Sequence, residues 1–136
     1  MSAARPELCV GAVAVDDGRL LLVRRGREPG AESWSVPGGR VEAGETMADA
    51  VVRELQEETG VAGVCGPMLG WVERITPGHH FVILDFTVSV VDPGQPVAGD
   101  DAAEAAWFPL GEVGAIGLVD GLGDFLHEHG IVQLIG

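Results

Sequence analysis

The sequence has few cysteines and no long apolar run, and each shortage argues against a class of protein. Its 136 residues include two cysteines, Cys9 and Cys65, which lack metal-like spacing, so we interpret them as buried reduced thiols. No apolar stretch approaches the ~20 residues that span a bilayer, which argues against a transmembrane helix. The first eight residues lack the apolar core of a signal peptide, and this favours a cytoplasmic location.

Basic residues are also scarce, and lysine is absent. The 21 acidic residues outweigh eight arginines and give a formal net charge of -13, which argues against binding the backbone of a nucleic acid polymer. Seven of the arginines lie before residue 54, and most of them fit ordinary surface charge. Because a guanidinium group suits phosphate, we expect an anionic ligand to bind either to arginines in the first half of the chain or through bound cations.

Length and hydrophobic patterning predict one mixed α/β domain over residues 1–136, without repeats or linkers. Apolar alternation around an Asp-Gly turn predicts a hairpin of residues 8–15 and 19–25. A short strand over 34–36 should end at the Pro-Gly-Gly breaker of residues 37–39. Further strands are predicted over 64–75, 81–91 and 105–109, and a last amphipathic helix over 119–129. Helices should pack on a largely mixed sheet.

The most clearly marked element is a helix over residues 47–59. Thr46, followed three residues later by Asp49, has the form of a capping box at its start. Gly60 stands where a C-terminal glycine cap is expected.

This helix carries Glu54, Glu57 and Glu58 at spacings of three and four, so their carboxylates project from neighbouring positions. Such like charges destabilise a helix by roughly a few tenths of a kcal/mol per pair unless a cation lies between them. Glu58 also falls where the apolar stripe of the helix would continue. Clustered carboxylates supply the hard oxygen ligands that Mg²⁺ prefers. The alternative is a solvated acidic face in which Arg53 pairs with Glu57.

Residues 39–61 fill every fixed position of the pattern G-x5-E-x7-R-E-U-x-E-E-x-G-U, where U is aliphatic. The matching residues are Gly39, Glu45, Arg53, Glu54, Leu55, Glu57, Glu58, Gly60 and Val61. This stretch resembles the signature, or box, of the Nudix hydrolases, and especially that of MutT-type members. The lead-in over residues 33–38 and the Trp-Phe-Pro-Leu segment at 107–110 resemble the family more loosely.

The resemblance implies an α/β/α sandwich with the box as loop, helix and loop, and a site for one or more Mg²⁺ or Mn²⁺ ions. The implied metal-binding residues are Gly38, through its carbonyl group, Glu54, Glu57 and Glu58. Glu45 would lie behind them or act as a further ligand. Arg53 would orient the carboxylates through ion pairs.

The reaction implied is hydrolysis of a pyrophosphate bond in a nucleoside diphosphate linked to another moiety, with a carboxylate accepting the proton of the attacking water. We expect Glu54 or Glu57 to be that base, or Glu104 from a later loop, with Asp100 and Asp101 as alternatives to it. Glu104 fits a plain surface acid at least as well.

The box does not distinguish substrates. A MutT-like nucleoside triphosphate pyrophosphohydrolase is slightly favoured over an ADP-ribose or nucleotide-sugar pyrophosphatase. A non-catalytic ligand sensor on the same fold would be expected to have lost box carboxylates, and none is missing. A calcium-binding module would need an EF-hand loop, which is absent from the sequence.

Substrate contacts are predicted from residues near the box and at strand ends. The candidates are Arg24, Arg25, Trp34 and His80. Trp34 fits core packing equally well, and His80 fits an exposed position at the start of a strand. The expected partner is a small nucleotide-like molecule, with neither a nucleic acid polymer nor a membrane. A homodimer is left open as the oligomeric state.

Overall fold

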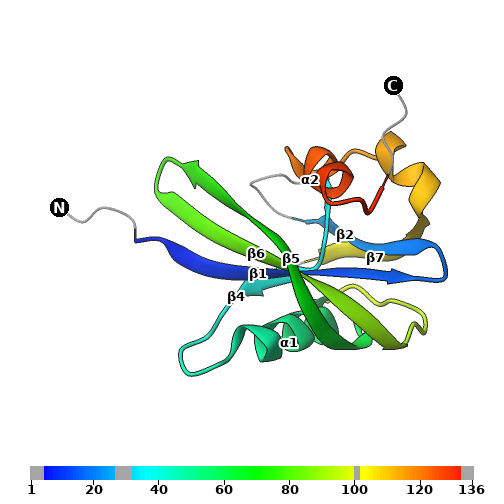
Figure 1. The fold of residues 1–136 in the computed structure, drawn as a ribbon, viewed down its shortest axis with the longest axis horizontal. Helices are drawn as coiled ribbons and strands as arrows, with labels where there is room; N and C mark the ends of the chain where they lie inside the picture. The colour runs from blue at the N-terminus through cyan, green and yellow to red at the C-terminus, as the bar shows by residue number, and fades with distance from the viewer. Residues whose placement is uncertain (1–4, 27–31, 100–101, 133–136) are drawn as a thin grey trace.

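A computed structural model describes residues 5–26, 32–99 and 102–132 of the chain. The elements in order are β1 (Glu7–Asp16), β2 (Arg19–Arg25), β3 (Trp34–Ser35), β4 (Gly38–Arg40), α1 (Met47–Thr59), β5 (Ala62–Thr76), β6 (His79–Asp92), β7 (Ala102–Pro109), the 3-10 helix η1 (Leu110–Ala115) and α2 (Leu122–Glu128). Helix α1 lies on one side of the sheet and α2 on the other (Figure 1). The predicted mixed sheet between helices is confirmed.

The sheet is mixed because one strand pair is parallel. Strands follow the order β3-β2-β1-β6-β5, with β4 added beside β1 and β7 beside β2. Strand β1 runs parallel to β6, and its first half also pairs with the antiparallel β4. Only its last residues pair with β2, across the predicted hairpin turn. Strand β1 therefore connects the two halves of the sheet.

The core divides into two clusters because β1 and β2 bury both of their faces. Val10, Ala12 and Ala14 point toward α1, while Val13 between them points toward α2. On the first side they meet Val51 and Leu55 of α1. The second cluster joins β1 and β2 to α2 through Leu20, Leu22, Val113, Leu122, Phe125 and Leu126. Each helix is thus fixed to its own face of the same strands.

Helix α1 has the predicted bounds and caps. The hydroxyl oxygen of Thr46 accepts a hydrogen bond from the backbone N–H of Asp49 at 3.1 Å. Gly60 adopts a left-handed conformation, with φ 71°, and its N–H bonds to the carbonyl oxygen of Gln56 at 2.8 Å. These local signals fix where the acidic helix starts and stops, and hence which of its turns carries the carboxylates.

The prediction that the Pro-Gly-Gly segment only ends a strand is wrong. Gly38 and Gly39 form strand β4, paired with Gly11 and Val10 of β1. A Cβ atom at Gly38 would collide with the carbonyl oxygen of Val10, so the close pairing requires glycine there. Glycine usually disfavours a strand, but here Gly38 and Gly39 allow the backbones of β4 and β1 to approach closely.

The predicted last helix is also too long, because α2 starts only at Leu122, after Gly121 with φ 84°. Leu118 instead forms a bridge to Trp34. Strands β5, β6 and β7 are longer than predicted.

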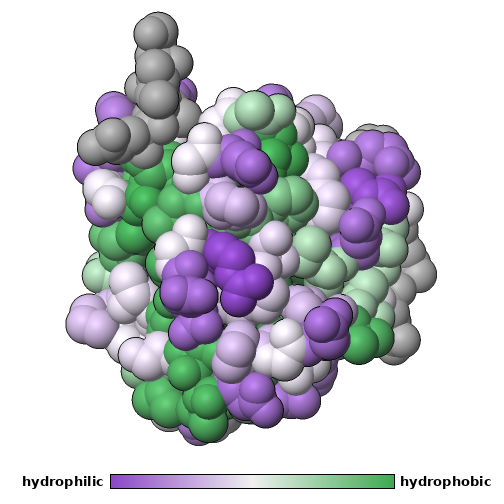
Figure 2. Space-filling view, turned by 90° about the vertical axis from the view of Figure 1, so that its right-hand side faces the viewer, coloured by the Kyte–Doolittle hydropathy of each residue, from purple (hydrophilic) through white to green (hydrophobic). Residues whose placement is uncertain are grey.

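Among the described residues, no helix is long and apolar enough to cross a membrane. On the face shown in Figure 2, hydrophilic side chains interrupt the hydrophobic areas.

Candidate active site

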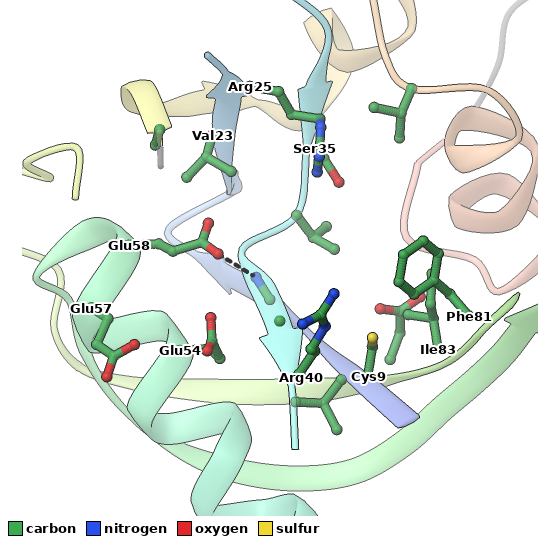
Figure 3. Close-up of a pocket in the computed structure, with 18 of the residues that line it drawn as sticks. Cys9, Val23, Arg25, Ser35, Arg40, Glu54, Glu57, Glu58, Phe81 and Ile83 are labelled. Atoms are coloured by element: carbon green, nitrogen blue, oxygen red, sulfur yellow. Dashed lines mark hydrogen bonds between the residues drawn. The ribbon is translucent and has the colours of Figure 1, made fainter. Parts of the chain in front are cut away.

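An open pocket of about 710 Å³ lies where β1 leaves β2, bounded by α1, β4, β2 and β6. Figure 3 shows the carboxylates of α1 on one side and the side chains of Phe81 and Ile83 on the other. Arg40 and Cys9 lie between these sides in the same view. The pocket therefore has an acidic end and an apolar end.

The acidic end is formed by α1 lying against the glycine strand β4. The carboxylate of Glu54 lies so close to Gly39 that any side chain at that position would collide with it. The N–H of Gly38 donates a hydrogen bond to Oε1 of Glu58 at 3.4 Å (Figure 3). The two glycines thus allow the carboxylates to rest directly on the backbone of β4.

Arg53 connects four acidic side chains around this end. Its Nε and Nη2 atoms donate to the two carboxylate oxygens of Glu45 at 2.7 and 2.9 Å. Its Nη1 donates to Glu54 at 2.8 Å and to Glu57 at 3.1 Å. The guanidinium also lies 3.9 Å from a carboxylate oxygen of Glu42. The paired bonds from Arg53 lower the pKa of Glu45 to about 2, so Glu45 remains ionised at neutral pH.

The pKa of Glu58 is shifted in the opposite direction to that of Glu45. Burial and the neighbouring carboxylate of Glu54 raise the pKa of Glu58 to about 8, despite opposing contributions from the Gly38 N–H and from Arg25. Two adjacent carboxylates that are both partly buried are costly to ionise together unless a cation lies beside them. Glu54 and Glu58 therefore form a donor pair whose chemistry fits a divalent cation.

Glu57 is separated from that pair. Its side chain is 58% exposed and is held by Arg53. Within residues 5–26, 32–99 and 102–132, no three acidic, histidine or cysteine side chains converge closely enough to hold an ion in this conformation. The structure thus brings Glu54 and Glu58 together but leaves Glu57 outside them, and the three-carboxylate metal site stays a prediction.

The predicted arginines both line the pocket, at the end of β2. Arg24 is engaged by Glu32 at 2.6 Å and by Glu104 at 3.4 Å. Glu104 lies opposite Arg24 on β7, and its side chain is 54% exposed and not part of the pocket lining. The alternatives at positions 100 and 101 lie outside the described residues.

Unlike the two arginines, the other two candidates for substrate contact, Trp34 and His80, are not part of the pocket lining. Trp34 packs edge-on against Phe108, with ring centroids 4.8 Å apart, at the margin of the second core cluster. The Nε2 atom of His80 lies 3.0 Å from a carboxylate oxygen of Glu73. Trp34 thus packs as the alternative for it expected, whereas His80 is only partly exposed, and a role of either residue with substrate stays a prediction.

Several lining residues were not singled out from the sequence. Phe81 of β6 forms part of the pocket wall. Cys9 and Asp85 also line the pocket, and both are buried. The signal available for Asp85 was a single acid within the apolar strand that surrounds it.

Comparison with known proteins identifies the family. The sequence model of the NUDIX domain matches residues 5–128. An ADP-ribose pyrophosphatase of Methanocaldococcus jannaschii is 37% identical over 107 residues, which cover 77% of this chain and 63% of that protein. The chain thus spans less than two thirds of this relative's length.

Solved structures agree with this assignment. The MutT NUDIX hydrolase of Burkholderia pseudomallei is 34% identical, with a TM-score of 0.71 over 78% of this chain and 84% of that one. The MutT protein of Methanosarcina mazei Go1 gives a TM-score of 0.82 at 25% identity, over 95% of this chain and 96% of that one. The family model covers most of the chain and these neighbours share its fold, so the chain belongs to the NUDIX domain family.

Proposed function

We propose that the protein hydrolyses a pyrophosphate bond in a nucleoside diphosphate linked to another moiety. The observation that carries this proposal is the crowding of Glu54 and Glu58 against β4, which leaves the partly buried carboxylate of Glu58 beside a like charge. Such an acidic site holds a polyanionic substrate only if a divalent cation intervenes. Glu54, Glu57, Glu58 and the carbonyl group of Gly38 would hold Mg²⁺ or Mn²⁺.

The bound cation would polarise the phosphoryl oxygens and activate a water molecule. Arg53 keeps Glu45 ionised and fixes Glu54 by direct hydrogen bonds, so the carboxylates meet the substrate already oriented. Glu54 or Glu57 takes the proton of the attacking water, since both line the pocket.

The phosphates would be bound beside these carboxylates. Arg25 projects into the pocket from the end of β2 and lies close enough to Glu58 to affect its pKa (Figure 3). It would bind a substrate phosphate. Glu104 is a less favourable base than the residues of α1, because its side chain is engaged with Arg24 outside the pocket lining.

Two substrate classes remain candidates. A nucleoside triphosphate is supported by the MutT names of the structural neighbours, and ADP-ribose by the name of the archaeal relative. We favour the nucleoside triphosphate slightly. We also propose that the chain forms a single domain and acts in the cytoplasm. Its substrate is a small molecule and not a nucleic acid polymer or a membrane. A homodimer is the alternative to a monomer.

The test is a phosphate-release screen of the purified protein with nucleoside triphosphates, oxidised dGTP, ADP-ribose and nucleotide sugars. Each substrate is assayed with Mg²⁺, with Mn²⁺ and with excess chelator. We expect cation-dependent turnover of one class at a kcat/KM far above the others. Absence of turnover with every substrate, together with a ligand retained through purification, would favour a non-catalytic sensor.

A further inference from the structure

The connection between β6 and β7 contacts the end of α1 that carries the glutamates. The backbone N–H of Gly99 donates a hydrogen bond to the carbonyl oxygen of Glu58 at 2.9 Å, and that of Val97 donates to the carbonyl oxygen of Thr59 at 2.9 Å. The last four carbonyl groups of a helix have no partner within it. The connection, which passes this end of α1 in Figure 1, therefore supplies two donors that the helix itself cannot.

Gly99 approaches α1 so closely that only glycine fits at this position. A Cβ atom there would collide with the carbonyl oxygen of Glu57 and lie 3.1 Å from the Cα atom of Glu58. Both atoms belong to the helix backbone, which cannot rotate away as the end of a flexible side chain can. A side chain at position 99 would therefore displace either the connection or the last turn of α1.

A second glycine contact holds the carboxylates near the same turn. Oε1 of Glu58 accepts a hydrogen bond from the N–H of Gly38 at 3.4 Å, and the carboxylate of Glu54 lies against Gly39. Strand β4 thus restrains the side chains of this part of α1, while Gly99 restrains its backbone. The position of the glutamates depends on both contacts.

The connection also leads to the arginines predicted to bind phosphate. The carbonyl oxygen of Gly99 accepts a hydrogen bond from the N–H of Ala102 at 3.2 Å, where β7 begins. Ala102 pairs in register with Arg25 of β2. Backbone contacts around Gly99 therefore join the glutamates of α1 to the end of β2, from which Arg25 projects into the pocket (Figure 3).

We propose that Gly99 is a positioning residue for the carboxylates of Glu57 and Glu58. It acts through the backbone of α1, because its close contact fixes the last turn of the helix relative to β4 and Arg25. This contact limits where the two carboxylates can lie when a cation binds. A methyl group at position 99 shifts that turn and weakens cation binding. The inference rests on the proposed function in one respect, which is that these glutamates hold the cation.

The primary test compares Mn²⁺ binding to the full chain in the wild type and in Gly99→Ala, without substrate, from the electron paramagnetic resonance signal of the free ion. We expect the dissociation constant to increase by about 10-fold or more, as when groups behind metal ligands are altered. Gly111→Ala is the matched control, since a methyl group at Gly111 would meet nothing within 4 Å. Measurements are made well below the unfolding transition of each protein. Equal affinities for wild type and Gly99→Ala would overturn the proposal.

Kinetics separate positioning from a general loss of structure. At a Mg²⁺ concentration that saturates the wild type, the kcat of Gly99→Ala should fall by about 10- to 100-fold. Raising the Mg²⁺ concentration should restore part of this loss, because the variant binds the cation more weakly. A loss of kcat that does not respond to Mg²⁺, at a temperature where the variant is folded, would contradict the positioning role.

Hydrogen exchange of the wild type tests the same coupling without a variant. If the contact at Gly99 favours cation binding, the bound cation must in return favour that contact. Saturating Mg²⁺ should therefore slow exchange of the Gly99 and Val97 amide protons by about 10-fold. A smaller change is expected at Ile131, whose N–H bonds to the carbonyl oxygen of Leu126 at 2.8 Å. Exchange at Gly99 and Val97 that is unchanged by Mg²⁺ would overturn the inference even should Gly99→Ala not fold.

The outcomes separate this inference from the proposed function. Cation-dependent turnover that is the same in wild type and Gly99→Ala would support the proposed function and remove the role of Gly99. Cation binding that depends on Gly99, in a protein that hydrolyses none of the substrates, would support the inference and remove the proposed hydrolysis. A wild type that binds no Mn²⁺ would remove both.

Discussion

The two ends of the pocket differ in how their charges are compensated. At the acidic end, Arg53 binds Glu45, Glu54 and Glu57, whereas Glu58 lies beside the carboxylate of Glu54. At the apolar end, Asp85 has no such partner for its Oδ1 atom. At the acidic end, Arg53 links several carboxylates, so a substitution of one residue should also change the positions of the others. At the apolar end, a substitution of Asp85 should change that residue's own contribution without disturbing such a network.

The largest expected effect lies at the acidic end. Glu57→Gln removes a candidate base and metal ligand while keeping the size of the side chain. We expect kcat to fall by about 1000-fold with the fold intact, as checked by steady-state kinetics and circular dichroism. Glu112→Gln, on the exposed surface of η1, is the charge-matched control. Near-normal turnover of Glu57→Gln would contradict the role proposed for this residue.

A smaller loss is expected when the network is weakened without removing its charge. Arg53→Lys keeps one positive charge but cannot reproduce the forked contacts to Glu45 and to the carbonyl oxygen of Arg40. We expect kcat/KM to fall by about 100-fold and the free energy of unfolding by about 2 kcal/mol. Urea unfolding and kinetics on the same preparation measure both. Unchanged kinetics would show that the orientation of these carboxylates does not depend on the guanidinium group.

The apolar end predicts a pH effect on stability. Burial raises the pKa of Asp85 to about 6, and His129 nearby opposes that rise only in part. Between about pH 4 and pH 6 the folded protein therefore keeps a proton that the unfolded chain has lost. Because ionising the buried group is unfavourable, its contribution to the free energy of unfolding falls as pH rises through this window, by up to about 3 kcal/mol.

Comparing wild type with Asp85→Asn isolates this contribution, since other titrations are shared. The difference between their free energies of unfolding, measured in urea from pH 3.5 to pH 7.5, should shift in favour of the variant as pH rises and then level off. A difference that is constant with pH would mean that Asp85 has an ordinary pKa in the folded protein.

The smallest effect is expected at a position that supports the acidic end without contacting it. Thr46→Ala removes the hydrogen bond to the N–H of Asp49 at the start of α1. We expect a loss of about 1 kcal/mol in the free energy of unfolding, measured by thermal or urea unfolding. The kcat/KM value at a temperature well below the transition should stay within about twofold, and a larger change would show that the cap also positions the carboxylates.

The sequence-based predictions succeeded where an element depends on residues close together in the sequence, and failed where it depends on distant ones. Helix α1 was predicted to the residue because its caps at Thr46 and Gly60 are local. Strand β4 was missed because its pairing depends on the close approach of Val10, which is distant in the sequence. Local propensity indicated only that glycines at positions 38 and 39 disfavour a strand.

The same distinction applies to the candidate site. The spacing of the glutamates placed them on one surface of α1, and the apolar stripe of the helix pointed to Glu58 as the one nearest the core. Neither signal indicated that Glu54 would lie against Gly39 of β4 while Glu57 remained exposed. The position of Asp85 in a strand was predictable from alternation. Its unpaired state was not, because that depends on glycines contributed by two other strands.

The glycines beside Asp85 also suggest how such a protein could diversify. A methyl group at Gly70 would meet the ring of His129 at 2.7 Å, at the far end of a side chain on the protein surface that has room to move. One at Gly11 would displace Asp85 itself. Single substitutions at these two positions would therefore reshape the surroundings of Asp85 while the glutamates of α1 stay where they are. Selection could then alter one end of the pocket without rebuilding the acidic end.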